Sequence, residues 1–586
     1  MIASRIVKSK AVCSRLPFEV FQQRCLSSVI SDSSSLKSRY DAIVIGAGHN
    51  GLISATYLAM KGLKVGVFER RHVVGGAAVT EEIVPGYKFS RASYVLSLLR
   101  PRIIKELNLE KHGLKVHLRQ TVAFTPILED GVNGKPPRSL CLYPDEKMNE
   151  EELKKFSMKD AKSLAAYDKY ILDIASAVSP LLETPPPNLK DGFWKALKTS
   201  KPLLDTVRKL DDVSSFYDFI TSPITKTLDR WFETDVLKAT LATDGVIGAM
   251  VSPHTPGSSY VLLHHMIGEA EGIKGAWGFV EGGMGAVSNA IAASAKEHGV
   301  DIFVDHEVQK IDIIDGNCGG ITLSNGNNVK SNIVLSNATP HVTFQKLLAD
   351  DFDALPEEYR KQITSFDYTS PVTKLNIAVD RIPNFLALQS SKPTEVPNQL
   401  KGTIHLNCED IGCINDAYLD AMQGRFSRRP MIELCIPSTV DTTLAPKGHH
   451  VLSVFTQYTP YYLNGTQEWT DSDRDDYRKI VFKSIEDYAP GFIDSVVGYE
   501  VLTPMDLENT FGLTGGNIFH GAIGLDQLFL SRPTSFMASQ RTPLQGLYIC
   551  GSGTHPGGGV MGACGRLGAM AVLSDLKSKK ISKNLS

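Results

Sequence analysis

Cysteine is scarce in this sequence, and its placement excludes two kinds of site. The nine cysteines include no C-x-x-C pair, and the two that stand nearest to each other are Cys408 and Cys413. An odd number of thiols without metal-ligand spacing is typical of reduced, mostly buried cysteines. We therefore expect no dithiol redox centre. No group of histidine, cysteine and carboxylate residues has the spacing of a metal site either.

Long apolar runs and an excess of one charge are missing as well. No stretch of about eighteen uninterrupted apolar residues occurs, which argues against a membrane-spanning helix. The 62 basic and 64 acidic residues nearly cancel to a formal charge of −2, so no overall field favours nucleic acid. The sequence predicts no nucleic-acid partner and no transmembrane span. It leaves peripheral membrane contact open, because a lipid-collecting face has the same pattern as an ordinary core face.

The N-terminal segment has few acids and many serine and basic residues. Glu19 is the only acid before Asp32, and no continuous apolar core indicates a secretory signal. This composition is typical of a mitochondrial transit peptide, and Arg24-Cys25-Leu26-Ser27 resembles a processing site that is cut before Ser27. We predict a transit peptide and disordered leader over residues 1–35 and a location in the mitochondrial matrix. A disordered basic tail without a targeting role is the alternative.

A dinucleotide-binding pattern follows in "YDAIVIGAGHNGLISATYLAMKGLKVGVFERRHVVGGAA". The apolar run 42–45 predicts a strand, Gly46-x-Gly48-x-x-Gly51 predicts a tight loop, and a helical pattern then continues to about Gly62. The first glycine allows the turn, the second lets the backbone approach a pyrophosphate, and the third lets the helix lie close to the strand. The free N–H groups at the start of that helix would face the phosphates.

The next predicted strand, 64–68, ends at an acid. Glu69 stands eighteen residues after Gly51, where its carboxylate can accept hydrogen bonds from a ribose hydroxyl. NAD- and FAD-binding units share these features. Gly75 and Gly76 favour FAD, because a further close approach of backbone suits a cofactor that continues past its pyrophosphate. A surface loop with a glycine pair is the alternative.

A second glycine-rich segment, "YICGSGTHPGGGVMGACG", lies near the end of the chain. Gly557-x-Gly559-x-x-Gly562 formally repeats the dinucleotide pattern, so a second nucleotide such as NADPH could be considered. No second strand with a terminal acid follows it, however. We therefore interpret this segment as a strand, a glycine loop and a closing helix over 567–576 that approach the same flavin cofactor from the other side.

The rest of the chain predicts a second, discontinuous domain. The sequence indicates helices after about Asp145, a return to α/β structure near Gly282, and an antiparallel sheet whose clearest strands are 373–379 and 449–458. The predicted division is a leader (1–35), three segments of an FAD-binding domain (38–125, 273–345, 516–580), and a substrate domain with a mainly helical part (126–272) and an antiparallel part (346–515).

Four motifs together resemble the phytoene dehydrogenase-like flavoproteins, the carotenoid and retinoid oxidoreductase family. They are "GAGHNGL", "FERRHVVGGAA", "GGMGAV" and "GSGTHPGGGVMGACG", and the resemblance runs from about Tyr40 to about Leu576. It implies an α/β protein with a discontinuous, glutathione-reductase-type FAD-binding Rossmann domain and an inserted α+β substrate domain. The cofactor-binding residues that it implies are Gly46, Gly48, Gly51, Glu69, Arg70, Gly75, Gly76, Val308, Gly551, Gly557, Gly558 and Gly559.

Two departures from related flavoproteins matter. The chain has neither the redox cysteine pair nor the second nucleotide domain of a disulfide reductase. Where many relatives carry an aspartate for the ribityl hydroxyls, this chain has Gly551-Ser552, so Ser552 can offer a hydrogen bond but no charge.

Catalytic residues are hard to identify, because a flavin itself accepts the hydride and the protein mainly positions substrate. His254, His264, His265, Lys374 and His555 are candidates, although such histidines are more often structural. We expect His555 to lie near the flavin rather than to catalyse.

The leading hypothesis is a mitochondrial FAD-dependent oxidoreductase that removes hydride from, or desaturates, an apolar carotenoid-, retinoid- or lipid-like molecule. The alternatives are a flavoprotein with structural FAD that acts through a mitochondrial protein partner, and a redox-neutral isomerase that uses reduced FAD.

Overall fold

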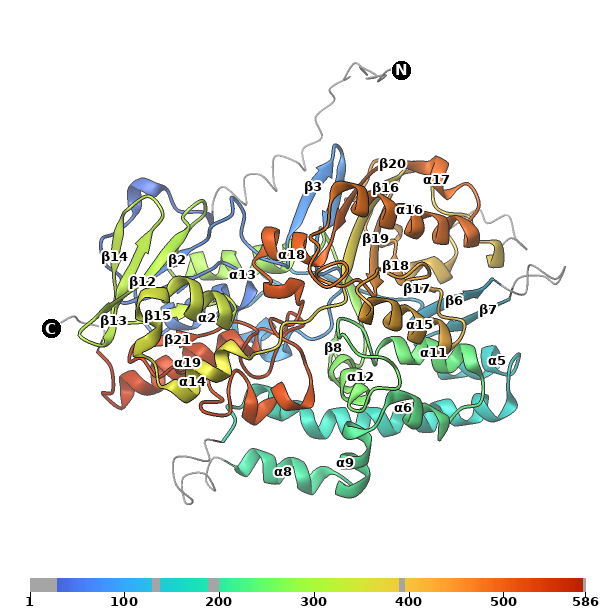
Figure 1. Cartoon of the computed structure of the whole chain (residues 1–586), viewed down its shortest axis with the longest axis horizontal. Helices are drawn as coiled ribbons and strands as arrows, with labels where there is room; N and C mark the ends of the chain where they lie inside the picture. Colours follow the sequence, from blue (N-terminus) through green and yellow to red (C-terminus); the bar gives the residue numbers. More distant parts are fainter. Residues whose placement is uncertain (1–28, 129–137, 188–199, 389–395, 583–586) are drawn as a thin grey trace, which may run out of the picture.

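The computed structural model describes residues 29–128, 138–187, 200–388 and 396–582. It has two sheets side by side, with a group of helices below the second one in the view of Figure 1. The five-stranded sheet lies on the left of that view, and the seven-stranded sheet lies on the right.

The five-stranded sheet is parallel throughout and draws its strands from three distant stretches of the chain. Its order is β11–β2–β1–β15–β21. The strands are β1 (Ala42–Ile45), β2 (Val65–Phe68), β11 (Asp301–Phe303), β15 (Val334–Ser336) and β21 (Leu547–Ile549). Every residue of β1 and β2 is buried, which explains their continuous apolar runs, because a parallel sheet is covered on both faces.

Helices cover one face of this sheet and a small antiparallel sheet covers the other. Val44 and Val67 pack with the helices, whereas Ile43, Ile45 and Phe68 pack with the antiparallel sheet, as the alternation of side chains along a strand requires. The helices are α2 (His49–Ala59), α13 (Gly285–Glu297) and α19 (Ala563–Lys577), and the small sheet contains β12 (Val308–Ile314), β13 (Asn317–Leu323) and β14 (Asn328–Lys330).

The seven-stranded sheet has the order β20–β16–β19–β18–β17–β6–β7 and is antiparallel except between β17 and β6. The strands are β6 (Ala123–Ile127), β7 (Arg138–Leu142), β16 (Thr373–Val379), β17 (Thr403–Leu406), β18 (Met431–Cys435), β19 (His450–Gln457) and β20 (Val496–Leu502). Helix α16 (Asp471–Tyr488) packs on one face through Tyr477, Val481 and Ile485. Polar side chains therefore gather on the opposite face.

The helices below this sheet share one apolar cluster. They include α5 (Glu146–Leu153), α6 (Met158–Val178), α9 (Val213–Thr221), α10 (Ile224–Asp229), α11 (Asp235–Thr243) and α12 (Ser258–Met266), and α8 (Lys201–Lys209) lies at the lower edge in Figure 1. Other elements are β3 (Thr80–Val84), β4 (Tyr87–Ser90), α3 (Pro101–Glu106), α14 (Glu357–Thr364), α15 (Ile411–Met422) and α18 (Pro504–Phe511). Within the described ranges, no helix combines the length and apolarity needed to cross a bilayer.

The structure differs from the predicted division at three places. Part of the predicted leader is folded: Val29 is buried, and Ser31 exchanges hydrogen bonds with Ile302 of β11; residues 1–28 lie outside the described residues. Strand β6 begins at Ala123, so residues 123–125, which were predicted to belong to the FAD-binding domain, already belong to the seven-stranded sheet. Residues 346–364 pack with the parallel sheet rather than with the antiparallel one, since Leu355 and other side chains there join its apolar cluster.

Candidate functional site

The first glycine loop joins β1 to α2 with very little space. Gly46 has a φ of +90°, which favours glycine, and Gly48 caps the start of α2. A Cβ on Gly51 would lie 2.1 Å from the carbonyl oxygen of Gly46. A side chain there would force the helix away from the strand. The loop therefore holds the N–H groups at the start of α2 in place for an anion.

The glycine pair after β2 lies directly against this loop. The N–H of Gly75 donates to the carbonyl oxygen of Ala47 at 2.9 Å, and Gly48 and Gly75 form an isolated parallel bridge. Gly75 has a φ of +120° and Gly76 a φ of +57°. These two residues belong to the same narrow site as the first loop.

Glu69 lies at the end of β2, beside the loop. Its carboxylate accepts hydrogen bonds from the N–H of Ala47 (2.8 Å) and of Arg71 (2.9 Å). Burial raises the pKa of Glu69, and the two N–H donors and the nearby arginine charges counteract that rise. Each carboxylate oxygen keeps a free lone pair, so a ribose hydroxyl could still donate to it.

Val308 opens β12 on the same side of the sheet. The preceding residues bind the end of β2, because Asp305 N–H donates to the carbonyl oxygen of Arg71 (3.0 Å) and His306 N–H donates to that of Glu69 (2.8 Å). These bonds place the buried Val308 next to the acid, where an adenine ring would follow the ribose.

The last glycine segment follows β21 and is equally tight. A Cβ on Gly551 would lie 2.6 Å from the carbonyl oxygen of Asn337, and a Cβ on Gly558 would lie 2.5 Å from Cα of Phe519. Gly557 and Gly559 have φ values of +115° and +109°. The helix that follows, α19, begins at Ala563, four residues earlier than predicted.

The two glycine-rich segments meet through Asn50 of α2. The Asn50 amide donates to Oγ of Ser552 at 3.1 Å and accepts from the N–H of Gly565 at 3.1 Å. Ser54 Oγ also donates to the carbonyl oxygen of Gly565 at 2.6 Å. The starts of α2 and α19 therefore lie side by side. The glycine-rich residues 46–51 and 75–76 form the first jaw of one site, and residues 551–562 form its second jaw.

In the part of the chain that the structure describes, several buried nitrogen atoms around these jaws have no hydrogen-bond partner. They include Nε2 of His49, Nη1 of Arg71 and Nδ1 of His520. Leaving such a group without a partner costs about 1–3 kcal/mol, so each of them fits a bound molecule with several acceptors. Burial lowers the pKa of His49 to about 4 and that of His520 to about 3, so both rings are neutral at pH 7. The pyrophosphate and ring oxygens of FAD suit these donors.

The predicted cofactor residue Arg70 contacts the end of α18, and two residues that the sequence analysis did not name lie beside Glu69 and the first glycine loop. The exposed Arg70 donates to the carbonyl oxygens of Asn509 (3.1 Å) and Thr510 (3.4 Å) at the end of α18, so it braces the two domains. Arg71 is the less exposed of the two arginines, and it pairs with Glu81 at 2.7 Å. Asn337, just after β15, donates to Gly46 and lies 2.7 Å from where a Gly48 Cβ would be.

The candidate histidines are mostly structural. His254 is exposed, Nδ1 of His265 donates to the carbonyl oxygen of Val261 at 2.8 Å, and Nε2 of His555 donates to the carbonyl oxygen of Leu181 at 2.9 Å. His264 differs, because neither of its buried nitrogens has a hydrogen-bond partner among the described residues, and burial lowers its pKa to about 3. Its Nε2 lies 3.5 Å from where a Gly559 Cβ would be.

Lys374 is a buried amine on the polar face of the seven-stranded sheet. Only 1% of its surface is exposed, and Nζ donates to the side-chain oxygen of Asn376 at 2.8 Å. Nζ also lies 5.5 Å from the ring centre of Tyr94. Burial lowers the pKa of Lys374 to about 7, so the amine can gain or lose a proton at neutral pH.

A polar row that the sequence analysis missed crosses the same face. In the strand register, Lys374 opposes Phe455, Phe455 opposes Glu433, and Glu433 opposes His405. Tyr94 Oη donates to Glu433 at 2.9 Å, and His405 Nε2 lies 3.5 Å from the other oxygen of that carboxylate. Burial would raise the pKa of Glu433, but hydrogen bonds from His405 and Tyr94 hold it below its usual value.

This row adjoins the first jaw. Ser93, next to Tyr94, donates through both its N–H (3.1 Å) and its hydroxyl (3.0 Å) to the carbonyl oxygen of Ala77, and Ala77 follows the glycine pair. The sequence signal was a polar residue between apolar neighbours in each strand, Glu433 within 431–435 and His405 within 403–406, because alternate strand positions face opposite sides of the sheet.

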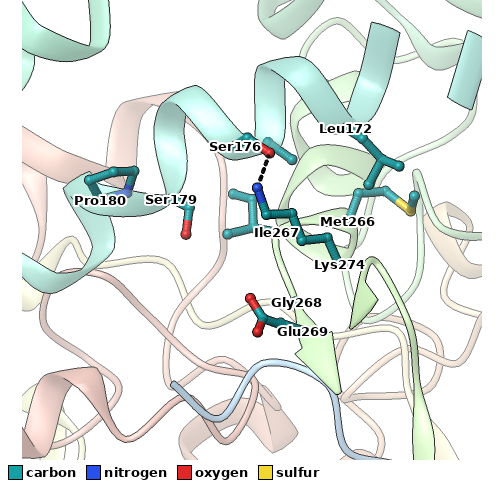
Figure 2. A pocket seen from close by; sticks show the side chains of 10 residues that line it. Leu172, Ser176, Ser179, Pro180, Met266, Ile267, Gly268, Glu269 and Lys274 are labelled. Atoms are coloured by element: carbon teal, nitrogen blue, oxygen red, sulfur yellow. Dashed lines mark hydrogen bonds between the residues drawn. The ribbon is translucent and has the colours of Figure 1, made fainter. Parts of the chain in front are cut away.

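A separate pocket lies between α6 and the segment 266–274 (Figure 2). Its volume is about 110 Å³, and Lys274 Nζ donates to Ser176 Oγ across it at 3.1 Å. This volume holds only a few water molecules, and none of the predicted cofactor residues lines the pocket. Within the described part of the chain, no group of three or more histidine, cysteine or carboxylate residues could hold a metal ion.

Known proteins resemble this chain over most of its length. It is 53% identical to pyridine nucleotide-disulfide oxidoreductase domain-containing protein 2 of Rattus norvegicus, over 93% of this chain and 95% of that protein. It is 26% identical to the chloroplastic prolycopene isomerase of Daucus carota, over 94% of this chain and 84% of that one. The structure of cyclohexylamine oxidase from Brevibacterium oxydans matches with a TM-score of 0.52 at 16% identity, over 92% of this chain and 100% of that one, and shows a shared fold.

These relatives support the resemblance to carotenoid-related flavoproteins and the assignment of FAD as the cofactor. All seven described cysteines are free, so the part of the chain that the structure describes holds no disulfide. Residues 51–566 match the family described as flavin containing amine oxidoreductase. The chain therefore belongs to the flavin-containing amine oxidoreductase family and is an FAD-dependent oxidoreductase.

Proposed function

We propose that this chain is a mitochondrial enzyme that removes hydride from, or desaturates, a largely apolar small molecule. The observation that carries the proposal is the junction of the two glycine-rich segments at Asn50, with unpartnered nitrogen atoms buried around it. FAD would supply the two-electron acceptor there, and the protein would supply orientation, exclusion of water and proton transfer. We further propose that the cofactor domain is of the glutathione-reductase type, with residues 38–125, 273–345 and 516–580 as its main segments.

Tyr94 and Glu433 are suited to accept the proton that a substrate loses together with hydride. The Tyr94 hydroxyl already donates to Glu433, so it can take a proton from the substrate while passing its own to the carboxylate. His405 and Lys374, whose amine has a pKa of about 7, lie along the same row and can take part in later proton release.

The proposal of an apolar substrate rests on a relative and on the surrounding side chains. One relative is named for prolycopene, a hydrocarbon. Phe455, Leu502 and Leu513 are buried in the apolar cluster that Tyr94 and Ala77 border. A molecule with an apolar body would fit beside these residues, with its reacting carbon near the polar row.

The location in the mitochondrial matrix rests on the leader sequence. Cleavage before Ser27 would leave Val29 and Ser31, which pack against the parallel sheet, on the mature protein. Sequencing the N-terminus of protein isolated from mitochondria tests this. A mature chain that begins at Met1, or one found only outside mitochondria, would contradict it.

The first test is an absorption spectrum of the purified chain from Ser27 onward, with identification of the nucleotide released on denaturation. We expect one FAD per chain, and anaerobic loss of flavin absorbance with an apolar polyene or terpene from a test panel. Glu433→Gln should slow that reduction about 100-fold or more, because the proton acceptor is lost. Glu82→Gln, at an exposed position, is the matched control.

The alternatives give different results in the same experiment. Bound FAD that no member of the panel reduces, together with a cellular role that survives Glu433→Gln, would support structural FAD acting through a protein partner. Product formed without net electron transfer would indicate isomerisation. A protein that neither contains nor takes up FAD would contradict the enzyme proposal as a whole.

A further inference from the structure

Arg532 is a fully buried cation whose hydrogen-bond partners are all neutral. Its exposed fraction is 0%, and its guanidinium donates only to backbone carbonyl oxygens. The shortest bond reaches Phe519 (2.7 Å), and others reach Ser552, Gly521, Ala522 and Gln527. Among the described residues, no carboxylate forms an ion pair with it. A buried charge is normally paired, so the missing negative charge calls for an explanation.

The guanidinium lies directly behind the second jaw. Two of its nitrogens bind the carbonyl oxygen of Ser552, at 3.0 and 3.3 Å, and its Nε lies 3.7 Å from where a Gly557 Cβ would be. Burial, and to a smaller extent the charge of Arg532, lowers the pKa of His264 to about 3 and that of His555 to about 4. These rings are therefore neutral at pH 7 and do not compete with Arg532 as a source of charge.

The missing negative charge can come from the cofactor in its reduced form. Reduction of FAD by two electrons and one proton adds a negative charge to the flavin ring. A fixed cation in a low-dielectric site stabilises such a developing charge without any rearrangement. We propose that the charge of Arg532, which its hydrogen bonds to the Ser552 carbonyl oxygen hold behind the second glycine-rich segment, stabilises reduced, anionic FAD and so raises its reduction potential. This inference needs bound FAD but no particular substrate.

The contrary interpretation is that Arg532 only holds the loop 519–532 in place. A variant of Gln527 distinguishes this interpretation from the proposal. Gln527 is buried in the same loop and makes similar bonds, accepting from the N–H of Asp367 (2.6 Å) and donating to the carbonyl oxygens of Asp367 and Ala522 (3.1 Å each). It carries no charge. Gln527→Leu therefore removes hydrogen bonds of the loop without changing the electrostatic field at the flavin. Arg532→Gln changes both the hydrogen bonds and the field, whereas Arg532→Lys keeps the positive charge.

The test measures the midpoint potential of FAD bound to each variant, by anaerobic equilibration with reference dyes. We expect Arg532→Gln to reduce the equilibrium constant for reduction about tenfold, which is about 30 mV for a two-electron couple. Sulfite, which adds to oxidised flavin as an anion, should bind about tenfold more weakly to the same variant. Arg532→Lys and Gln527→Leu should remain close to the unchanged protein in both measurements.

Two results would overturn the proposal for a protein that binds FAD. One is an Arg532→Gln variant with unchanged potential, and the other is an equal shift in Gln527→Leu. If Arg532→Gln does not fold, the measurement on the unchanged protein tests the proposal by itself. A midpoint potential of bound FAD no higher than that of free FAD, together with no sulfite adduct, would overturn it. Failure to bind FAD at all would overturn it together with the flavoprotein assignment, so the two failures are distinguishable.

Discussion

At the scale of single residues, the tightest constraint is the contact between Gly51 and Gly46. We predict that Gly51→Ala loses FAD and lowers the free energy of unfolding by about 1–3 kcal/mol, because its Cβ would lie 2.1 Å from a carbonyl oxygen. Gly62→Ala is the control: its φ is +82° but nothing lies within 4 Å, so it should cost about 1 kcal/mol and keep FAD. FAD content after gel filtration and urea unfolding measure both effects. A Gly51→Ala protein with full FAD content would contradict the close-approach argument.

Lys374 gives a prediction about pH. Burial lowers its pKa to about 7 in the folded chain, whereas an unfolded lysine titrates near 10.4. Between these values the unfolded chain binds the extra proton, so stability rises with pH. Below about pH 7 the folded state carries the full cost of the buried charge. Lys374→Met should therefore stabilise the FAD-free protein most at pH 6, by a few kcal/mol, with the gain fading towards pH 10. Urea unfolding across this range measures it, and a gain that does not change with pH would contradict the assigned pKa.

Individual residues also show where sequence reasoning stops. The spacing of Gly46, Gly48 and Gly51 was informative because Gly46 has a φ of +90° and a side chain at Gly48 or Gly51 would collide with neighbouring atoms. Arg70 and Arg71 are adjacent and chemically identical, so only the direction of each side chain distinguishes the one that contacts α18 from the one that pairs with Glu81. Asn337 lies far along the chain from the loop that it contacts, and no local pattern could assign it.

At the scale of elements, local patterns predicted strands better than they predicted partners. The strand predicted at 373–379 is β16, and the one predicted at 449–458 is β19, because alternation and β-branched residues are local signals. Strands β6 and β7 were assigned to other regions, since their place in the seven-stranded sheet depends on pairing with β17, about 280 residues away in the chain. The polar row follows from the same long-range register.

The packing of α19 on α2 is the element contact on which the second jaw depends. A Cβ on Gly565 would lie 2.3 Å from the carbonyl oxygen of Asn50, so Gly565→Ala should separate the two helices. We predict a loss of about 1–3 kcal/mol in stability and weaker FAD binding, although residue 565 is far along the chain from the first loop. Ser574→Ala, on the exposed side of α19, is the matched control. Isothermal titration of the FAD-free proteins would measure the affinity, and equal affinities would contradict the two-jaw site.

At the scale of the whole molecule, one sheet unites three stretches of chain that are separated by a second domain. The central strands β1 and β15 pair although about 290 residues separate them, and β21 adds about 210 more. FAD would touch all three stretches, through the loops after β1, before β12 and after β21. Binding of a ligand to the folded state stabilises every segment that must be folded for the ligand to bind. FAD should therefore stabilise the three stretches together.

Hydrogen exchange with and without FAD tests this directly. We expect FAD to slow exchange together in residues 46–52, 305–309 and 551–562, because opening any one of the three would release the cofactor. Helix α16, which packs on the face of the seven-stranded sheet opposite the polar row, should change little and serve as the internal control. Slowing confined to the first stretch would mean that the nucleotide is held by one jaw alone, as in a simple dinucleotide-binding unit. Slowing in all three, reduced in the last stretch by Gly565→Ala, would show that the glycine-rich end of the chain closes the site.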